Sequence, residues 1–337
     1  MRHYFGIFFL FVSSVFGVSF THSKYGLEFL RSGVGARAEG MGNAYTAVAE
    51  DVTAVYWNPA GLVRLKSIEL HGMHAERFLG VVNYDFFGFG MRFGETRAMG
   101  LGIVRLGVDN IPITNIRNPD RELGELYTDS QGKLVLNRPY VAKYVSDQEW
   151  AFLFSYGVQK TEKWAWGCNL KTLFKAMGDS SAWGLGLDLG VQWNPVYRLR
   201  TALTLRDVTT TLLAWNRGQK EWIAPRVTWG FAYPIAFRKF SFLPALDWGW
   251  DLNGMGKVSK WHWGIMDFEL LGGLEVSYLD RIAFRIGSGH GRWNIGTGFR
   301  VSFFRFDYSY SSHPDLGNSH HISTVLQWDK MAAFLHK

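Results

Sequence analysis

The stretch WGLGLDLGVQW, Trp183 to Trp193, alternates large apolar residues with small or polar ones without a break. Strict alternation with a period of two is typical of a β-strand, whose successive side chains point to opposite faces. The large set would lie on one face and the small set on the other. The large set is Trp183, Leu185, Leu187, Leu189, Val191 and Trp193, and the small set is Gly184, Gly186, Asp188, Gly190 and Gln192.

The same scheme recurs along the chain, in WAFLFSYGV (150–158), FLPALDWGWDL (242–252) and LLGGLEVSY (270–278). A soluble sandwich would carry charges and threonine on its second face, whereas here that face is mostly glycine, alanine and serine. Apolar residues outside, aromatic residues at the strand ends and small or polar residues inside are typical of a membrane β-barrel. A soluble sandwich or lipocalin-like barrel is the alternative, because alternation is a weak signal in any one segment.

Charged residues within the alternating segments fall on the small-residue face. A charge that faces lipid near the middle of a bilayer costs about 2–4 kcal/mol, so these residues are expected to point into the lumen. We expect them to form ion pairs there, which we favour over a catalytic role. The candidate lumen charges are Asp188, Asp247, Glu275, Arg285, Arg300 and Asp307.

The predicted fold is all-β, a transmembrane antiparallel β-barrel of about fourteen strands over residues 66–328, with ~9–11 residues for each crossing. Long connections at 107–148, 208–224 and 253–264 would follow strands three, seven and nine, and short connections would follow the even-numbered strands. Long connections after odd-numbered strands and short ones after even-numbered strands agree with a barrel that has short turns at one end and long loops at the other. No turn signal occurs near Phe303, so twelve strands is an alternative.

Residues 1–19 read as a signal peptide, with Arg2 before the apolar run Tyr4–Phe16 and small residues after it. A membrane anchor is the alternative, although the run is shorter than the ~20 residues of a spanning helix. The net charge of +7 contains no Lys/Arg block, so no nucleic-acid partner is expected. Cys168 is the only cysteine, which excludes an internal disulfide and a multi-cysteine metal site.

The segment VYWNPAGL, Val55 to Leu62, predicts a sharp corner before the first strand. Pro59 lacks a backbone donor and pushes Asn58 towards extended geometry. Asn58 can form an Asx-turn, and Gly61 can take a positive φ. Ala60 and Gly61 would allow another surface to come close.

With this context, the segment Phe29–Leu62 resembles the N-terminal hatch of the FadL-type outer-membrane transporters, whose hallmark is an Asn-Pro-Ala corner before the first barrel strand. It is closer still to the PorV/PorQ-like and UPF0164 branch, which has a GAR…MG.AY.A…D…YWNPAGL pattern. DVTTTLLAW, IAFRIG and FDYSY also look like that branch, so the resemblance covers nearly the whole mature chain. The residues of the hatch motif are Gly35, Arg37, Gly42, Asn58, Pro59, Ala60 and Gly61.

The resemblance implies that residues 20–65 form a hatch of short helices that plugs the lumen. It also implies that a hydrophobic ligand enters from the external loops and leaves sideways at a kinked third strand. Gly100, Gly102 and Gly107 are candidates for that kink, and ordinary lumen packing is the alternative for them.

The long connection after the third strand carries Ile111, Ile113 and Ile116, which could line an outer apolar groove or simply pack in a loop. The chain is shorter than the fatty-acid transporters proper. Its tail, residues 329–337, runs past Trp328, whereas many barrel chains end on an aromatic residue of the last strand.

The resemblance implies an outer-membrane channel of a diderm bacterium that takes up hydrophobic small molecules, with long-chain fatty acids as the first candidate. Membrane lipid and the barrel-assembly machinery would be its partners. The rival interpretation is a PorV-like barrel that acts as a partner in protein secretion or surface attachment, and a third is a purely structural or adhesive surface barrel.

No pattern in the chain predicts an enzyme, a cofactor or a metal site. GVGARA contains the GxGxxA spacing of dinucleotide-binding loops, but no βαβ unit surrounds it. His71 and His74 would lie on opposite faces of a strand, which is poor geometry for a metal.

Overall fold

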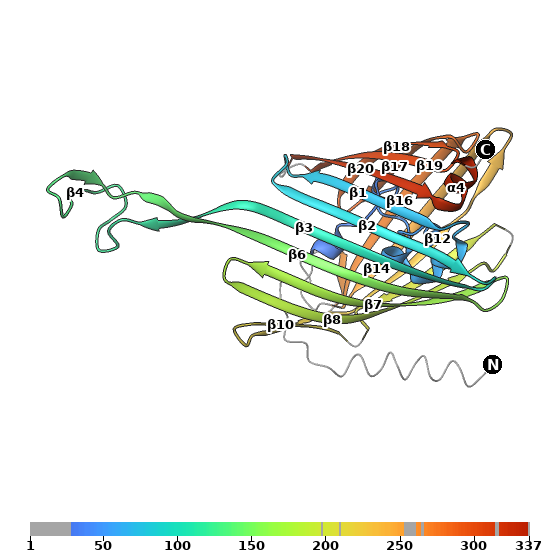
Figure 1. Cartoon of the computed structure of the whole chain (residues 1–337), viewed down its shortest axis with the longest axis horizontal. Helices are drawn as coiled ribbons and strands as arrows, with labels where there is room; N and C mark the ends of the chain where they lie inside the picture. The colour runs from blue at the N-terminus through green and yellow to red at the C-terminus, as the bar shows by residue number, and fades with distance from the viewer. Residues whose placement is uncertain are drawn as a thin grey trace.

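The structure is a computed structural model. It describes residues 28–196, 198–208, 210–252, 261–263, 266–313 and 317–335. The described chain forms a closed antiparallel β-barrel with short helices inside it and a long two-stranded arm at one end (Figure 1). The predicted signal peptide, residues 1–19, lies outside the described residues.

The described wall has fourteen strands that follow one another in chain order, and β20 pairs with β1 to close the ring. Two of the wall positions are composite: β9 and β10 form the seventh strand, and β11, β12 and β13 form the eighth. The short strand β15 pairs with β16. The bounds are β1 (Glu69–Arg77), β2 (Val82–Phe93), β3 (Arg97–Ile116), β6 (Pro139–Gln159), β7 (Trp164–Met177), β8 (Ser180–Trp193), β9 (Arg200–Arg206), β10 (Thr211–Trp215), β11 (Lys220–Ile223), β12 (Arg226–Ala232), β13 (Ile235–Phe237), β14 (Phe240–Asp251), β15 (Trp261–Trp263), β16 (Met266–Tyr278), β17 (Ile282–Gly289), β18 (Arg292–Val301), β19 (Phe304–His313) and β20 (Gly317–Gln327).

The prediction of fourteen antiparallel strands is confirmed, and the alternative of twelve is wrong. β18 and β19 are separate strands that pair from Val301 and Phe304 outward. Ser302 takes a positive φ of 49° in the turn between them, without the glycine, proline or asparagine that would have marked the turn in the sequence.

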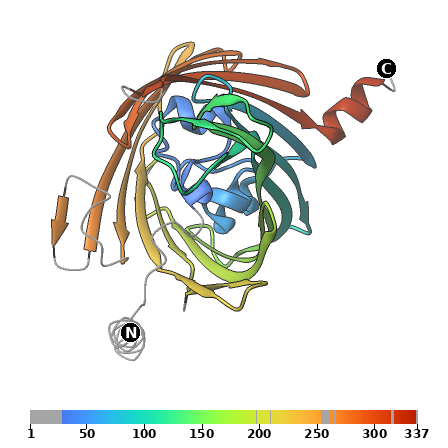
Figure 2. The same ribbon diagram turned by 90° about the vertical axis from the view of Figure 1, so that its left-hand side faces the viewer.

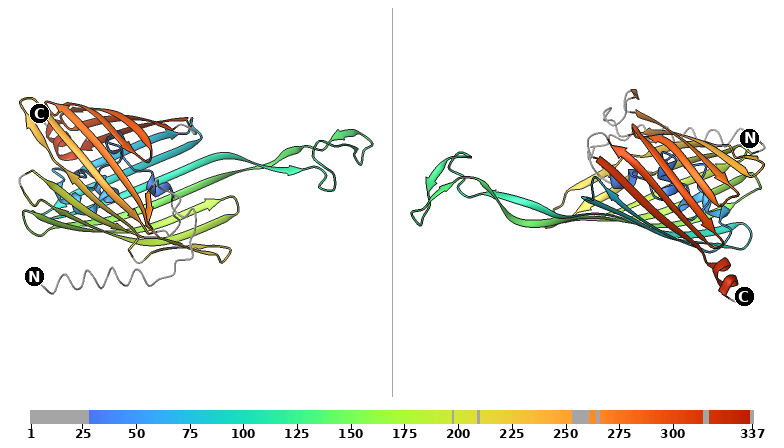
Figure 3. Two further views of the ribbon diagram at one scale, coloured as in Figure 1. Left: turned by 180° about the vertical axis from the view of Figure 1, so that it is seen from behind. Right: turned by 90° about the horizontal axis from the view of Figure 1, so that it is seen from above.

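The two ends of the barrel differ, and the two further views in Figure 3 show the contrast. The arm projects from one end, called the arm end here, and the helix α4 (Trp328–Leu335) lies at the other, called the tail end. The short connections 94–96, 160–163 and 279–281 lie at the tail end. No helix in the described ranges is both long and apolar enough to span a membrane.

The arm replaces the long loop that was expected at 107–148. β3 and β6 continue past the barrel as a paired ribbon as far as Ile116 and Pro139, and β4 (Leu126–Thr128) pairs with β5 (Leu134–Leu136) at its tip. β-Branched and aromatic residues on both strands favour this extended pairing over a packed loop. The exposed apolar residues of the arm are Ile113, Ile116, Leu123, Leu126, Leu134, Leu136, Tyr140, Val141 and Tyr144.

The wall is irregular at its seventh strand, where β9 ends and β10 begins. Leu205 pairs with Leu189 and Leu212 pairs with Leu185, so the seventh strand has more residues than its neighbour over the same span. This is a large bulge. The expected long connection at 208–224 therefore contains wall strands, and most of the one at 253–264 lies outside the described residues.

The hatch lies inside the barrel, as the view along the barrel in Figure 2 shows. It comprises η1 (Glu28–Arg31), α2 (Ala36–Gly40), α3 (Ala54–Trp57) and η2 (Pro59–Arg64). Every residue from 33 to 49 and from 51 to 63 is buried. The hydrophobic core of the molecule is thus the contact between the hatch and the wall, and not a layer between two sheets.

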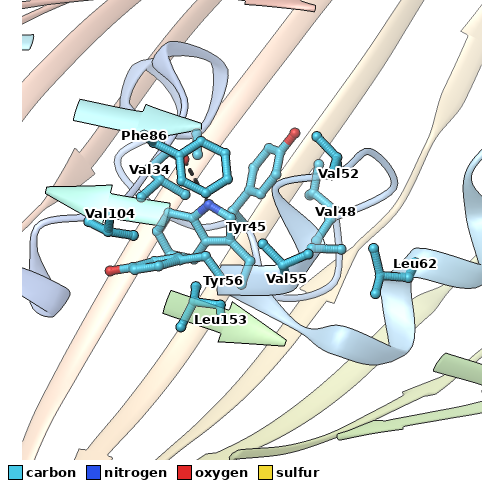
Figure 4. Close-up of a cluster of buried hydrophobic side chains, with 14 of the residues drawn as sticks. Val34, Tyr45, Val48, Val52, Val55, Tyr56, Leu62, Phe86, Val104 and Leu153 are labelled. Carbon is cyan, nitrogen blue, oxygen red and sulfur yellow. Dashed lines mark hydrogen bonds between the residues drawn. The ribbon is translucent and has the colours of Figure 1, made fainter. Parts of the chain in front are cut away.

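The inner face of the wall is less uniform than expected. On β2, β3 and β6 it carries Phe86, Val104 and Leu153, which pack against hatch side chains in the cluster of Figure 4. The hatch residues labelled in that cluster are Val34, Tyr45, Val48, Val52, Val55, Tyr56 and Leu62. The expectation of a small or polar lumen face holds for β17 to β20 but is wrong for this side, because the hatch supplies an apolar partner there.

Candidate functional site

The corner between the hatch and the wall is held by the side chain of Asn58. Asn58 is extended, with φ −163° and ψ 105°, and its Oδ1 accepts a hydrogen bond of 3.1 Å from the Ala60 backbone N–H. Its Nδ2 donates to the Val191 carbonyl of β8 at 3.2 Å. The corner is therefore bonded to itself and to the wall at once.

Gly61 serves the corner by close approach rather than by its backbone angle. It lies within η2 and is not among the residues with positive φ, so the expectation of a positive φ at Gly61 is wrong. A Cβ at this position would lie 2.3 Å from the carbonyl oxygen of Ala49. The glycine is needed because two parts of the hatch touch there.

Two glycines of the wall contact the corner between the hatch and the first strand. A Cβ on Gly190 of β8 would lie 2.1 Å from Asn58 Oδ1, and one on Gly167 of β7 would lie 2.3 Å from the backbone nitrogen of Ala60. A methyl group at either position would require the corner or the wall to shift. Hatch and wall therefore meet backbone to backbone at Gly167, whereas Gly190 makes room for the side chains of Asn58 and Pro59.

A second contact of the same kind lies at the turn after α2. Gly42 takes φ +63°, and Gly35, before the helix, takes φ +90°, so both hatch glycines need left-handed geometry. On the wall, a Cβ on Gly273 or Gly287 would lie 2.2 Å from a backbone atom of Met41 or Gly42. The hatch is thus seated between glycines on opposite arcs of the barrel.

The candidate kink glycines do not interrupt the wall. The β2–β3 ladder runs in unbroken register through Gly100, Gly102 and Gly107. Gly100 and Gly102 face inward, where an added Cβ would lie 2.5 and 2.7 Å from Val55 of the hatch. Gly107 is placed differently, because its nearest neighbours are the side chains of Arg105 and Gln148. In this conformation, Gly100 and Gly102 make room for the hatch to pack against the wall inside the lumen.

Asp247 of β14 holds the middle of the hatch. Its Oδ2 accepts hydrogen bonds from the backbone N–H groups of Tyr45 and Thr46, at 3.0 and 2.9 Å. The side chain is 1% exposed, so both bonds lie out of water. Instead of pairing with an arginine, as expected, this carboxylate binds the backbone of the hatch.

A chain of buried ion pairs links α2 to the wall. Arg37 donates to both carboxylate oxygens of Glu275 on β16, at 2.8 and 2.7 Å. Arg285 on β17 lies 2.5 Å from the same carboxylate. Glu275 therefore bridges a hatch arginine and a wall arginine, and a bidentate arginine–carboxylate pair is among the stronger polar contacts.

The chain of pairs continues across β19. Arg285 lies 2.9 Å from Asp307, and Asp307 accepts from Arg305 at 2.8 Å. Arg305 then reaches Asp51 of the hatch at 2.6 Å. One row of alternating positive and negative side chains therefore starts at Arg37 of the hatch, crosses the wall and ends at Asp51 of the hatch.

The acidic hatch residues are held in their charged form. Burial alone would raise the pKa of Glu50, but Arg37, Arg200 and Arg64 outweigh burial and hold that pKa below its ordinary value. For Asp51, burial again acts to raise the pKa, and Arg305 outweighs it. Both carboxylates therefore favour the folded, seated hatch at neutral pH.

The two remaining candidate charges lie apart from this row. Asp188 of β8 binds Lys171 of β7 at 2.7 Å and accepts from Asn169 at 3.0 Å. Arg300 of β18 faces a cavity of about 170 Å³ at the tail end, between the hatch and strands β14 to β19. The structure thus brings Glu275, Arg285 and Asp307 into contact and leaves the other three separate.

Sequence reasoning missed several residues that hold the hatch. The sequence pattern predicts no contact for Glu50 and Asp51 of the hatch, and the predicted lumen charges do not include Arg305. Arg305 lies two residues before Asp307, so in a strand both side chains point to the same face. The alternation therefore already indicates that Arg305 points into the lumen. The wall glycines Gly167 and Gly190 lie on the small-residue face, but nothing in the sequence shows which of those glycines the hatch touches.

Comparison with known proteins gives a result for the fold only. No protein-family model matches the chain, and no curated protein matches its sequence. The toluene transporter TbuX of Ralstonia pickettii matches with a TM-score of 0.55 and 12% identity, over 88% of this chain and 98% of that chain.

Two other solved structures match in the same way. A FadL homologue of Pseudomonas aeruginosa has a TM-score of 0.51 and 9% identity, with 86% of this chain and 96% of that chain covered. The toluene transporter TodX of Pseudomonas putida has a TM-score of 0.51 and 10% identity, with 87% and 96% covered. This chain therefore shares the fold of these two toluene transporters and of the FadL homologue over 86–88% of its length.

Proposed function

We propose that this protein is an outer-membrane channel for the uptake of hydrophobic small molecules. The observation that carries the proposal is a buried hatch inside a closed barrel whose fold is shared with two toluene transporters and a FadL homologue. Export by a cleaved signal peptide and insertion by the barrel-assembly machinery would bring it to the outer membrane of a diderm bacterium. Transport would follow the concentration gradient.

Long-chain fatty acids are the first solute to test. The proposed pathway enters at the arm end and requires the hatch to leave its seat, because the hatch is buried from residue 33 to 49 and from 51 to 63. Side chains of the apolar cluster in Figure 4 would be the first surfaces that an apolar solute meets once the hatch moves.

Uptake of labelled oleate and labelled toluene would be measured in cells that lack their own channel and express this chain. We expect saturable uptake, reduced in Asn58→Ala because the corner loses its bonds to Ala60 and Val191. Gly72→Ala is the matched control, since its nearest atom is 3.7 Å away on the neighbouring strand. Uptake equal to that of cells without the protein, for both solutes, would contradict the proposal.

One observation favours a second candidate, a PorV-like barrel that serves as a partner in protein secretion or surface attachment. The arm carries exposed apolar residues on a ribbon that pairs only within itself beyond Ile113 and Lys143 among the described residues. Cross-linking in cells would compare the intact chain with a variant that lacks residues 112–143. A secretion protein captured by the intact chain alone, together with no solute uptake, would favour this candidate.

A further inference from the structure

A row of three arginines crosses neighbouring strands at the tail end. Arg300 of β18 pairs directly opposite Arg305 of β19. On its other side, the Arg300 backbone N–H donates to the carbonyl of Arg281, just before β17, at 2.7 Å. All three line the same cavity of about 170 Å³. Like charges directly opposite each other in a sheet are destabilising, so this row has an electrostatic cost.

Among the described residues, carboxylates form ion pairs with only one of these three arginines. Arg305 pairs with Asp51 and Asp307. In the described ranges, Arg281 and Arg300 have no carboxylate within ion-pair distance, although Asp280 also lines the cavity. Arg281 and Arg300 are both exposed at the mouth of this small cavity. Their positive charges are therefore not neutralised by a described ion pair.

Apart from Asp280, the other charges that line the cavity are already engaged in ion pairs. Glu275 is shared by Arg37 and Arg285, and Glu50 is shared by Arg37 and Arg200. These carboxylates therefore contribute little free negative charge towards the mouth. A cleft with an excess of one sign and walls of low polarity concentrates counter-ions of the other sign.

We propose that the tail-end cavity binds an oxyanion group, a carboxylate or a phosphate, between Arg281 and Arg300. The planar donors of arginine match both oxyanions, and the bound anion would relieve the repulsion within the row. The cavity is smaller than the ~300–1,000 Å³ that encloses a drug-sized ligand, so it would hold a small anion or the headgroup of a larger molecule.

This inference deepens the proposed function and, for the transported class, rests on it. The cavity lies between the hatch and the tail-end turns, so an amphiphile that passed the hatch would meet these arginines before it left the barrel. An anionic amphiphile with an acidic headgroup would then be the preferred solute, ahead of a neutral hydrocarbon.

The test is equilibrium binding to the purified full-length protein in a neutral detergent, by isothermal calorimetry at low salt. The probes are inorganic phosphate, decanoate and decanol. We expect the double variant Arg281→Gln with Arg300→Gln to bind decanoate or phosphate at least about tenfold more weakly, the loss expected for removal of charge-assisted hydrogen bonds. Rising salt should weaken binding to the unmodified protein more than binding to the variant.

Lys163→Gln is the matched control, because Lys163 is an exposed cation in a short tail-end turn and does not line the cavity. It should bind as the unmodified protein does. Retention of the folded gel mobility without heating would show that each variant still forms its barrel. Equal affinity of the double variant and the unmodified protein for both anions would overturn the inference.

The probes separate the source of the anion and the two proposals. Decanoate bound far more tightly than phosphate identifies a headgroup site, and equal binding identifies a site for a free anion; either supports the inference if the arginines are required. Uptake of oleate with arginine-independent binding would overturn the inference alone. Arginine-dependent phosphate binding without uptake of any solute would overturn the proposed function alone.

Discussion

At the scale of single residues, the fit between hatch and wall depends on glycines that leave no room for a side chain. Gly190→Ala would place a methyl group 2.1 Å from Asn58 Oδ1. We expect a loss of about 1–3 kcal/mol in the free energy of unfolding, as for overpacked cores. Urea unfolding in lipid vesicles would measure it, with Gly72→Ala as a control that changes stability by much less.

The same pair allows a test by a double-mutant cycle. Asn58→Ala removes the atom that the new methyl group would strike, so the two substitutions together should cost less than the sum of their separate costs. Additive losses would show that Gly190 and Asn58 do not meet in the folded protein.

Glu275 carries a second prediction at this scale. Glu275→Gln would leave Arg37 and Arg285 buried with one counter-charge fewer, and breaking a buried ion pair in this way typically costs about 3–5 kcal/mol. Glu162→Gln, in an exposed turn at the same end, should have almost no effect in the same unfolding measurement. A Glu275→Gln protein as stable as this control would refute the structural role of the ion-pair chain.

The inward direction of these residues could be predicted from the sequence, but their partners could not. Alternation assigns Asp188, Asp247 and Glu275 to the lumen face because a strand has a period of two. Which arginine, lysine or backbone amide each one meets depends on how the hatch sits in the ring. For example, Asp247 binds two backbone N–H groups about 200 residues away in the chain, and no local pattern encodes that contact.

At the scale of elements, the hatch should loosen in acid. The pKa values of Glu50 and Asp51 are lower in the folded state than in the unfolded chain, where they are about 4.3 and 3.9. Their contribution to stability is therefore complete above the unfolded pKa and is lost as the pH falls below it. Hydrogen exchange of residues 36–63, corrected for intrinsic rates, should accelerate from about pH 5 downward.

The wall provides the comparison for this experiment. β2 and β7 pair on both sides with other strands, so their backbone amides should stay protected over the same pH range. Equal protection of the hatch at pH 7 and pH 3 would show that these carboxylates do not hold it in its seat.

The arm should be dispensable for the barrel. Among the described residues, residues 112–143 form strand pairs only within the ribbon and its tip, so replacing them by an Asn-Gly turn removes no strand pairing with the wall and breaks one exposed ion pair, Lys143 with Asp179 at 3.2 Å. We expect a change in unfolding free energy below about 1 kcal/mol, because surface loops tolerate large changes of length. A variant that failed to fold into vesicles would show that the arm contributes to assembly.

Most wall strands could be predicted and the arm could not. The wall strands alternate strictly because one face points out of the barrel and the other into the lumen, whereas both faces of the arm are exposed and no alternation is needed there. Residues 211–215, which form β10, are predicted from the sequence as part of the connection 208–224 for a related reason, since the bulge between β9 and β10 breaks the period of two. Alternation of apolar and polar residues marks a strand only where its two faces have different surroundings. It gives no signal where both faces are exposed.

At the scale of the whole molecule, the wall glycines that contact the hatch determine how the lumen can open. Side-chain gates swing aside one by one, which gives leak currents and graded sub-states. Here the main chain of the hatch contacts the main chain of the wall on opposite arcs of the ring, at Gly167 and Gly287, so no single side chain can swing aside to open the lumen. Planar-bilayer recordings should show a silent baseline interrupted by rare, full-sized openings. A steady ohmic current would mean that ions pass the hatch. The lumen of the protein in a membrane would then not be closed.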